Sequence, residues 1–472
     1  MKESIRFVLI IACGGLAFSQ NPGTFSATGS MTVSRHFYTA TLLANGKVLI
    51  AGGQDLGDPS SLESGNFSSL NSAELYDPTT GAFTHTGNMI SPRAYHSATL
   101  LPDGKVLIAG GSGLNYSGWL IATAELYDPD TETFSATGDM VNPGPVTAIL
   151  LASGKVLLAH ARLGFGPVTA EVYDPVAGAF SATGDQLVIW GGYQQGALLP
   201  DGRVLLAICC TAEQIYDPET GVFSYTAAMT GIYQDSFAAT SLANGKVLVQ
   251  GGYLEEGNVA TADANLYDPS RGIFTSPGKM TTPRYAHTAT LLGDGTVLIA
   301  GGFGSRSGDP APFTAEIYDP ASGTFSRTGN LTTARTGHAA TLLLDGTLLI
   351  TGGDGVGTAE IYRPIRPVSA PRLFPAPGDT QGQGAIWHAN TGEIASPSHP
   401  AAQGEILSMY TTGLVTGGAM PPQVALGGRL AAVQYFGPTP EYPGYFQVNF
   451  TVRRNHTRIE RACAAYLSRP AE

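Results

Sequence analysis

One unit recurs along this chain, and its clearest copy joins Pro92–Gly111 (PRAYHSATLLPDGKVLIAGG) to Ala124–Gly138 (AELYDPDTETFSATG). A turn glycine of this unit recurs with a mean period of 50 residues, at Gly46, Gly104, Gly154, Gly202, Gly245, Gly295 and Gly346. A tyrosine recurs in step with it, at Tyr76, Tyr127, Tyr173, Tyr216, Tyr267, Tyr318 and Tyr362. Self-similarity at such a period indicates a repeat architecture, in which each unit buries its apolar face against its neighbours.

Each unit is predicted to form four short antiparallel strands. In the clearest copy they cover residues 96–101, 105–109 and 124–127, with a fourth around Phe134. Asp103-Gly104 suits a tight hairpin, because glycine adopts positive φ without steric cost. Asp-Pro suits the turn before the fourth strand, because proline fixes φ and aspartate accepts hydrogen bonds from the turn backbone.

The count of fourth strands predicts how the array closes. Their aromatic residue follows the first six tyrosines, at Phe83, Phe134, Phe180, Phe223, Phe274 and Phe325, and is absent after Tyr362. The missing copy is GTFSATGSM, from Gly23 to Met31, which has no first three strands of its own. We therefore expect an all-β fold over residues 20–364, a seven-bladed β-propeller whose last blade is closed by the N-terminal strand, leaving no open sheet edge.

These repeats resemble kelch repeats. The resemblance rests on the period, the third-strand tyrosine and glycine doublets at Gly52-Gly53, Gly110-Gly111, Gly251-Gly252, Gly301-Gly302 and Gly352-Gly353. It covers residues 23–364 and implies the galactose oxidase and kelch-like fold. Blades 3 and 4 depart from it, because Ala159-His160 and Cys209-Cys210 replace the doublet.

The flanking segments are of different kinds. Residues 1–19 read as an export signal, with Lys2 and Arg6 before an apolar run and a small-x-small cleavage site at Ala17-Phe18-Ser19. The run before Cys13 is short for a lipoprotein signal, so secretion to the extracellular space or periplasm is favoured over anchoring at Cys13. Residues 365–384 are rich in proline and glycine and read as a linker.

Residues 385–472 show short alternating strands typical of a small immunoglobulin-like β-sandwich. Their GEILSMYTTGL and QVALGGRLAAVQYFGPTP segments resemble a C-terminal domain of secreted acidobacterial proteins, a resemblance that implies export. The arginine-rich end, residues 453–472, suggests that this domain is truncated and poorly ordered.

Composition narrows the partners. A net charge of −12 gives no reason to expect nucleic acid. No stretch after the signal is long and apolar enough to span a membrane. Once the signal is removed, Cys209, Cys210 and Cys463 remain, an odd number that is not a disulfide framework. The sequence does not set the oligomeric state.

The variable loops predict the working face. Loops between the second and third strands differ widely in length between blades, whereas the turns at the opposite face are short and stereotyped. Binding residues concentrate on variable loops of a rigid scaffold. Near the axis of this face we expect contacts from Tyr116, Trp119, His160, Phe165, Tyr253, Phe303 and Arg306.

Charged residues inside the repeat predict a structural pair. Arginines recur three residues before an inner-strand position, and glutamates two residues before the repeat tyrosine. Blades 4 and 5 lack both, and blade 3 has Glu171 without an arginine. Because buried charges are normally paired, we expect buried pairs Arg35–Glu74, Arg93–Glu125, Arg284–Glu316 and Arg335–Glu360. An anion-binding ring of arginines is the alternative.

Histidines 96, 287 and 338 share one repeat position, which Val146 and Phe237 fill elsewhere. A position that accepts valine and phenylalanine favours packing over metal ligation. Arg93-Ala94-Tyr95-His96-Ser97 nevertheless resembles the copper-ligand Tyr-His segment of galactose oxidase. That family also needs a cysteine-linked tyrosine and a histidine from the following domain. Here the propeller cysteines end a second strand, and His388 and His399 lack the family's surrounding motif.

The sequence therefore favours a secreted kelch-repeat protein that binds a glycan or an extracellular protein through its loop-rich face, with no catalytic residue, metal ligand or cofactor assigned. Whether the chain is an enzyme is left open, with the balance against it. The alternative is an extracellular copper-radical oxidase of the galactose or glyoxal oxidase kind, or another carbohydrate-active enzyme, and copper is expected only under that alternative.

Overall fold

The computed structural model describes residues 23–55, 68–113, 120–160, 164–165, 170–184, 190–191, 194–208, 213–229, 236–254, 259–304, 313–353 and 356–364, together with five later strands. Within these ranges the chain forms strands and turns and contains no helix. The predicted export signal and the linker at 365–384 lie outside the described residues.

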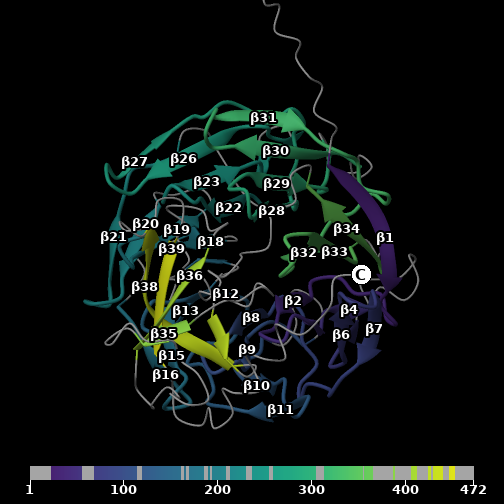
Figure 1. Ribbon diagram of the computed structural model, residues 1–472, viewed down its shortest axis with the longest axis vertical. Coiled ribbons are helices and arrows are strands. Elements are labelled where there is room, and N and C mark those ends of the chain that lie inside the picture. The colour runs from purple at the N-terminus through teal and green to yellow at the C-terminus, as the bar shows by residue number, and fades with distance from the viewer. Residues whose placement is uncertain are drawn as a thin grey trace, which may run out of the picture.

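Seven four-stranded antiparallel sheets are arranged in a ring about a central axis (Figure 1). Blade 1 holds β2 (Thr39–Leu42), β3 (Val48–Ala51), β6 (Ala73–Asp77) and β7 (Ala82–His85). Blade 2 holds β8 (Ser97–Leu100), β9 (Val106–Ala109), β10 (Ala124–Asp128) and β11 (Thr133–Ala136). Blade 3 holds β12 (Val146–Leu150), β13 (Val156–His160), β15 (Ala170–Asp174) and β16 (Ala179–Ala182).

The remaining blades repeat this order. Blade 4 holds β18 (Gln194–Leu198), β19 (Val204–Ile208), β20 (Gln214–Asp217) and β21 (Val222–Tyr225). Blade 5 holds β22 (Ala238–Ser241), β23 (Val247–Gln250), β26 (Ala264–Asp268) and β27 (Ile273–Thr275). Blade 6 holds β28 (Thr288–Leu291), β29 (Val297–Ala300), β30 (Ala315–Asp319) and β31 (Thr324–Arg327). Blade 7 holds β32 (Ala339–Leu342), β33 (Leu348–Thr351), β34 (Thr358–Arg363) and β1 (Thr24–Ser30).

The two ends of the propeller meet in blade 7. Strand β1 pairs antiparallel with β34, with Phe25 opposite Tyr362, so the first strand of the chain completes the last blade (Figure 1). The Thr28 hydroxyl also lies 3.0 Å from the Tyr76 hydroxyl, which ties this closing strand to blade 1. The prediction of a seven-bladed propeller closed by its N-terminal strand is confirmed.

The core lies between blades, and the second strands supply most of it. Every residue of β3, β9, β23, β29 and β33 is buried, which explains why these strands read as unbroken apolar runs. The repeat tyrosine packs on the fourth-strand phenylalanine of its own blade in all seven blades, as in Tyr127–Phe134 with ring centres 4.8 Å apart.

The glycine doublets are required by a close approach between blades. Gly301 has a φ of +63°, and a Cβ added there would lie 2.6 Å from the Arg335 carbonyl oxygen and 2.7 Å from His338 Cε1. Side chains other than glycine are strained at this φ, and the added atom would also collide with blade 7. The doublet thus lets the next blade lie directly on the end of the second strand.

Short two-stranded hairpins lie at the loop-rich end of the ring. They are formed by β4 (Gln54–Asp55) with β5 (Ser68–Ser69), β14 (Gly164–Phe165) with β17 (Trp190–Gly191), and β24 (Tyr253–Leu254) with β25 (Val259–Ala260). They begin where second strands end, on the side of the ring where the chain passes from blade to blade.

After the propeller, β35 (Ile386–His388), β36 (Ile406–Thr411), β37 (Val424–Leu426), β38 (Arg429–Pro438) and β39 (Phe446–Thr451) form one sheet, in the order β35-β36-β39-β38-β37. The immunoglobulin-like sandwich stays a prediction, because the rest of residues 365–472 lies outside the described ranges.

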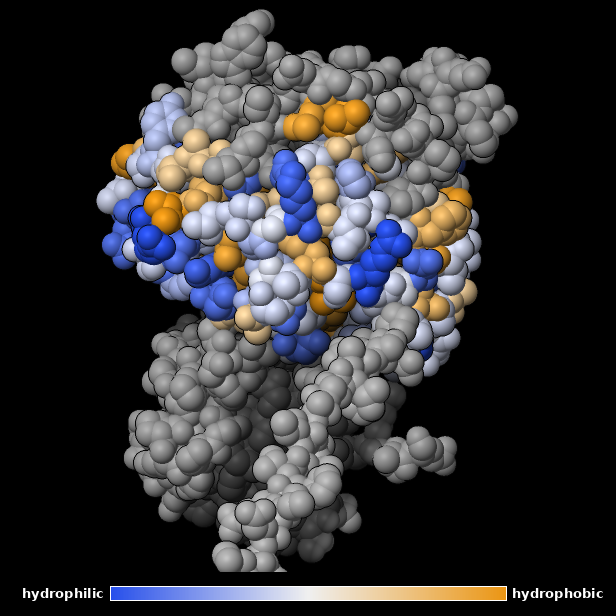
Figure 2. Space-filling model, turned by 90° about the horizontal axis from the view of Figure 1, so that it is seen from above, coloured by the Kyte–Doolittle hydropathy of each residue, from blue (hydrophilic) through white to orange (hydrophobic). Residues whose placement is uncertain are grey.

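Among the described residues, no helix is long and apolar enough to cross a membrane. On the side drawn in Figure 2, hydrophilic and hydrophobic residues are interspersed around the ring. Exposed apolar side chains such as Val176 and Val222 are scattered over different blades. Single exposed apolar residues are normal on soluble proteins.

Replacing Gly301 by alanine should destabilise the propeller far more than replacing Gly323, in the same blade. Both have positive φ, but an added Cβ at Gly323 meets nothing within 4 Å. Gly323→Ala should cost about 1–2 kcal/mol from backbone strain alone, and Gly301→Ala about 1–3 kcal/mol more from overpacking. Urea denaturation of the two variants measures the difference, and equal losses would show that the contact between blades is not what selects the glycine.

Candidate functional site

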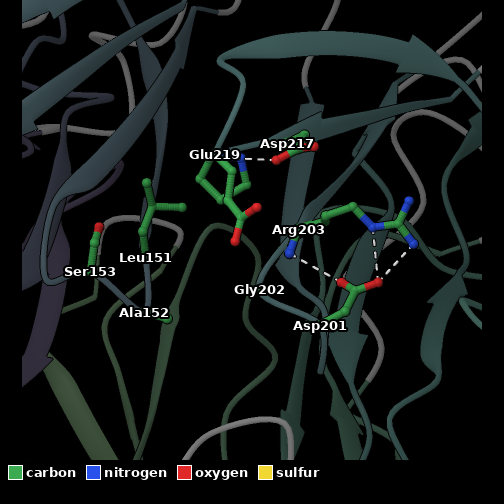
Figure 3. A pocket seen from close by; sticks show the side chains of 9 residues that line it. Leu151, Ala152, Ser153, Asp201, Gly202, Arg203, Asp217 and Glu219 are labelled. Atoms are coloured by element: carbon green, nitrogen blue, oxygen red, sulfur yellow. Dashed lines mark hydrogen bonds and ion pairs between the residues drawn. The ribbon is translucent and has the colours of Figure 1, made fainter.

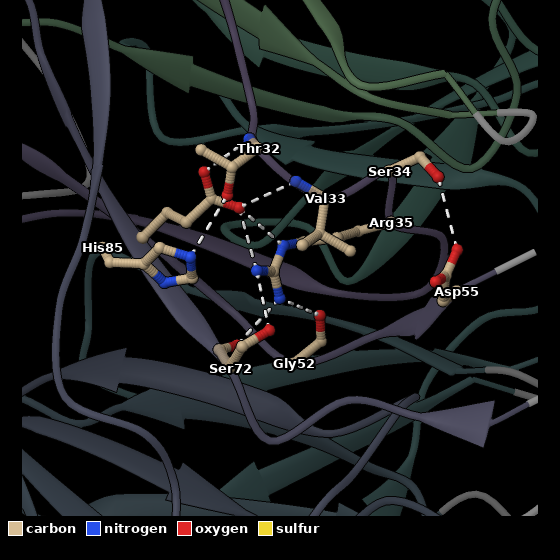
Figure 4. Close-up of polar contacts among 9 residues, drawn as sticks. Thr32, Val33, Ser34, Arg35, Gly52, Asp55, Ser72 and His85 are labelled. Carbon is tan, nitrogen blue, oxygen red and sulfur yellow. Dashed lines mark hydrogen bonds and ion pairs between the residues drawn. The ribbon is translucent and has the colours of Figure 1, made fainter. Parts of the chain in front are cut away.

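Buried arginine–glutamate pairs hold the loop-rich end of four blades. Arg35 Nη2 lies 2.9 Å from Glu74 Oε1, and neither side chain is exposed to solvent. The same guanidinium donates to the carbonyl oxygens of Gly52 and Ser72, at 3.0 and 2.8 Å (Figure 4). The second Glu74 oxygen accepts the Thr32 backbone N–H at 2.8 Å. One ion pair therefore connects the entering chain, the end of the second strand and the start of the third.

The equivalent distances are 2.7 Å for Arg93–Glu125, 3.0 Å for Arg284–Glu316 and 2.7 Å for Arg335–Glu360. Each arginine also donates to the first carbonyl of its blade's glycine doublet, at Gly110, Gly301 and Gly352. With every charge paired inside its own blade, the arginines do not form an anion-binding ring.

In blade 3 a histidine is the partner of the repeat glutamate. His160 Nε2 lies 2.8 Å from Glu171 Oε1, so His160 contacts the glutamate that has no arginine in this blade. His160 is only 5% exposed, and its contact with a ligand stays a prediction. His160 stands where other blades have a glycine of the doublet. The repeat pattern therefore did not suggest it as the partner of Glu171.

Blade 4 carries a buried carboxylate that sequence reasoning missed. Glu213 occupies the position of a small repeat alanine such as Ala73 or Ala124, and it is 1% exposed. Its Oε2 accepts the Met229 backbone N–H at 3.1 Å. In blade 1 the equivalent N–H, of Met89, donates to the Asn71 carbonyl oxygen instead. Burial raises the pKa of Glu213 to about 7.

The side chains of His96, His287 and His338 pack between neighbouring blades, and we call this repeat position the wedge. Each is 7–8% exposed and lies against the first doublet glycine of the preceding blade, as His96 does against Gly52. His96 Nε2 lies 3.0 Å from Thr39 Oγ1 of blade 1. Burial, aided by the charge of Arg93, lowers the pKa of His96 to about 3, so the ring is neutral. Tyr38 fills the equivalent place in blade 1 and bonds Thr351 of blade 7.

The residue before each wedge position lies at the start of its blade's innermost strand, near the axis of the ring. Five of these residues share a left-handed backbone conformation. They form what we call the collar: Phe37, Tyr95, Ser236, Ala286 and Gly337, with φ between +50° and +57°. Neighbouring members are joined by backbone hydrogen bonds, from Tyr95 N to Phe37 O at 3.0 Å and from Ala286 N to Ser236 O at 2.8 Å.

Two groups of aromatic rings lie at the collar. On blades 1 and 2 the rings of His36, Phe37 and Tyr95 are stacked, with centres 3.8 and 4.0 Å apart. On blades 5 and 6 Tyr285 lies between Tyr253 and Phe303, with centres 5.0 and 4.9 Å apart. All six rings are half-buried.

Of the seven expected contacts, the structure brings together Tyr253 and Phe303. It does so through Tyr285, which was missed because Ala94 occupies its position in the clearest repeat. The backbone of Phe165 pairs with that of Trp190 in a short hairpin. Tyr116, Trp119 and Arg306 lie outside the described residues.

A cavity of about 410 Å³ opens at the opposite end of the ring, between the turns of blades 3 and 4. Its lining includes Ser153, Asp201, Arg203, Asp217 and Glu219 (Figure 3). Arg203 is bound to Asp201 at 2.7 Å, whereas the equivalent Lys155 of blade 3 reaches Asp174 of the third strand. The carboxylates stand on exposed turns, and we assign this cavity no chemistry.

This chain is a seven-bladed β-propeller that resembles the galactose oxidase and kelch-like superfamily. It is 28% identical over 370 residues to two curated galactose oxidases of Gibberella zeae, an alignment that covers 72% of this chain. The chain spans about half the length of these relatives, since the alignment covers 47% of each. No protein-family model matches it.

Its fold is also similar to a solved fungal alcohol oxidase of the AA5 family, in complex with copper. The TM-score is 0.61 at 18% identity, covering 94% of this chain and 95% of that one. At this identity the likeness shows the fold alone.

These comparisons overturn two expectations. The binding protein, favoured from the sequence, is contradicted because the relatives are oxidases, and the oxidase held as the alternative is better supported. The expectation of no cofactor is likewise contradicted, because the sequence relatives are galactose oxidases, the family whose copper-ligand segment Arg93–Ser97 resembles. The sequence analysis gave the repeat position of His96 more weight than the resemblance of Arg93–Ser97 to the copper-ligand segment.

The described residues do not by themselves form a copper centre. Tyr95 and His96 point in different directions, because one stacks on Phe37 and the other is wedged against Gly52. No three His, Cys, Asp or Glu side chains gather around one point in the part of the chain that the structure describes. The described donors therefore do not complete a copper site, and Tyr95 is the one at the collar with suitable chemistry.

Removing Arg93 should destabilise the protein by about 3–5 kcal/mol, because Glu125 would be left charged, buried and unpaired. The matched control is Lys105→Ala in the same blade, which removes a half-exposed pair with Asp128 and should cost about 0–1 kcal/mol. Chemical denaturation of Arg93→Ala and Lys105→Ala gives both values. A loss under about 1 kcal/mol for Arg93→Ala would contradict a stabilising role for the buried Arg93–Glu125 pair.

Glu213→Gln should stabilise the protein at alkaline pH. The folded-state pKa of Glu213 is raised from 4.5 to about 7, so its contribution is fully present below pH 4.5 and is lost as the pH rises through about 7. The variant and the wild type should melt alike near pH ~5, and the variant should melt higher near pH ~8.5. Glu219→Gln, on an exposed turn, should show no such pH-dependent difference. A parallel pH profile for Glu213→Gln and wild type would refute this assignment.

Proposed function

We propose that this protein is an oxidase of the galactose oxidase type that converts an alcohol to a carbonyl compound, with its reactive centre at the collar. The sequence relation to two galactose oxidases over most of this chain supports the activity. We further propose that it acts outside the cytoplasm, which the predicted export signal supports.

The observation that carries the proposal is the placement of Tyr95. It belongs to the segment that resembles the family's copper-ligand Tyr-His motif, and it is half-buried at the axial end of blade 2. Its left-handed φ of 56° is unusual for a bulky residue. Such backbone strain concentrates at functional sites. No other described tyrosine combines these features.

An alcohol group carried by a sugar is the substrate class to test first. Galactose oxidase is named for a sugar, and the half-buried rings of Tyr253, Tyr285 and Phe303 stand beside Ala286 of the collar. A glycan thus enters the proposal as a substrate. Oxidation of an alcohol by dioxygen removes two electrons and two protons, and it yields one carbonyl group and one hydrogen peroxide.

Mature protein incubated with Cu²⁺ and freed of excess metal should retain copper and release hydrogen peroxide from galactose, galactose-bearing polysaccharides or simple primary alcohols. Tyr95→Phe should lower kcat/KM by roughly a hundredfold or more, as loss of a reacting group does. Tyr225→Phe, an exposed outer-strand tyrosine, is the control and should be unchanged. A copper-loaded protein that releases no peroxide from any of these alcohols would disprove the proposal.

A further inference from the structure

The three-ring stack at the collar differs from the aromatic packing of the repeat. His36–Phe37 and Phe37–Tyr95 are nearly parallel, at 29° and 26°, with centres 3.8 and 4.0 Å apart. The seven repeat Tyr–Phe pairs are tilted, as in Tyr318–Phe325 at 41° and 4.7 Å. Because it breaks the repeat geometry, the stack is a local feature of blades 1 and 2.

The backbone of this stack is strained and tightly held. Phe37 and Tyr95 adopt φ of 54° and 56°, a conformation that costs an L-residue about 1–2 kcal/mol. Other collar members in this conformation are small, namely Ser236, Ala286 and Gly337. Reciprocal hydrogen bonds between His36 and Gln54, at 3.0 and 2.7 Å, fix the residue before Phe37.

Blade 7 supports the far side of the stack. A Cβ added to Gly337 would lie 2.1 Å from His36 Nε2, so the imidazole occupies the space that a side chain would need. His36 thus lies between Gly337 and Phe37, and Phe37 lies between His36 and Tyr95. The row runs from blade 7 through blade 1 to blade 2.

We infer that Phe37 is a positioning residue for Tyr95: through its stacked ring, backed by His36 against Gly337, it fixes the plane in which the Tyr95 phenol is presented at the collar. The importance of that plane to catalysis rests on the proposed function, whereas the constraint on Tyr95 itself does not.

The test compares a planar with a non-planar substitution. Protein without added metal, labelled with ¹³C only in tyrosine rings, is examined by NMR, and Tyr95→Phe identifies the Tyr95 signal by its loss. Ring relaxation should report an ordered Tyr95 in wild type and in Phe37→Tyr. In Phe37→Leu, which keeps the bulk but not the plane, the Tyr95 ring should become mobile. Phe325→Leu removes a half-buried ring from a repeat pair and should leave Tyr95 ordered.

Turnover supplies the second readout. If Tyr95 is the reacting residue, Phe37→Leu should lower kcat roughly ten- to hundredfold with little change in KM, and Phe37→Tyr should restore it. An equally ordered Tyr95 ring in Phe37→Leu and wild type would overturn the inference. A mobile ring in a protein whose wild type releases no peroxide would instead uphold the positioning role and refute the oxidase.

Discussion

Closure of the ring is the constraint on which the rest of the structure depends. Without closure, β34 would lack its fourth-strand partner and β1 would be an isolated strand, and the pairing of β1 with β34 satisfies both. Closure also brings blade 7 against blade 1, where Gly337 meets His36 and Tyr38 bonds Thr351. The stack that holds Tyr95 begins at this seam, so the candidate site is a consequence of the closed ring as much as of its own residues.

The buried arginine–glutamate pairs explain how closely related blades tolerate different loops. Each pair fixes the carbonyl end of the second strand and the start of the third strand, the two points between which the variable loop runs. Their side chains are at most 2% exposed, and together with their additional backbone partners this places them among ion pairs that are costly to break. In blade 3 the arginine–glutamate pair is replaced by His160–Glu171, and in blades 4 and 5 the buried residues Gln214 and Asn265 stand where the glutamate would be.

Much of the fold was predictable because the repeat contains residues that each suit one particular local structure. Turn glycines, the third-strand tyrosine and the missing seventh fourth-strand aromatic were enough to predict the blades and their closure. The expected arginine–glutamate partners also lie together, since their joint loss from blades 4 and 5 is visible in the sequence. His160 and Glu213 were not predictable in this way, because each departs from the repeat and finds a partner that only the folded blade brings near.

The candidate site was predictable only in part, because Tyr95 and His96 lie within the repeat pattern. Tyr95-His96 was discounted since histidine recurs at that position, yet the structure separates the two residues: His96 is a wedge and Tyr95 a strained collar residue stacked on Phe37. Fold likeness alone does not carry activity, and the sequence relation to galactose oxidases is what shifts the interpretation from binding to oxidation.

The most direct measurement is the visible absorption spectrum of the protein loaded with Cu²⁺. If Tyr95 is a ligand at the collar, a phenolate-to-copper charge-transfer band should appear, vanish in Tyr95→Phe and persist in Tyr225→Phe. A copper-loaded protein without such a band, or with a band that survives the loss of Tyr95, would contradict the placement of the reactive centre at the collar.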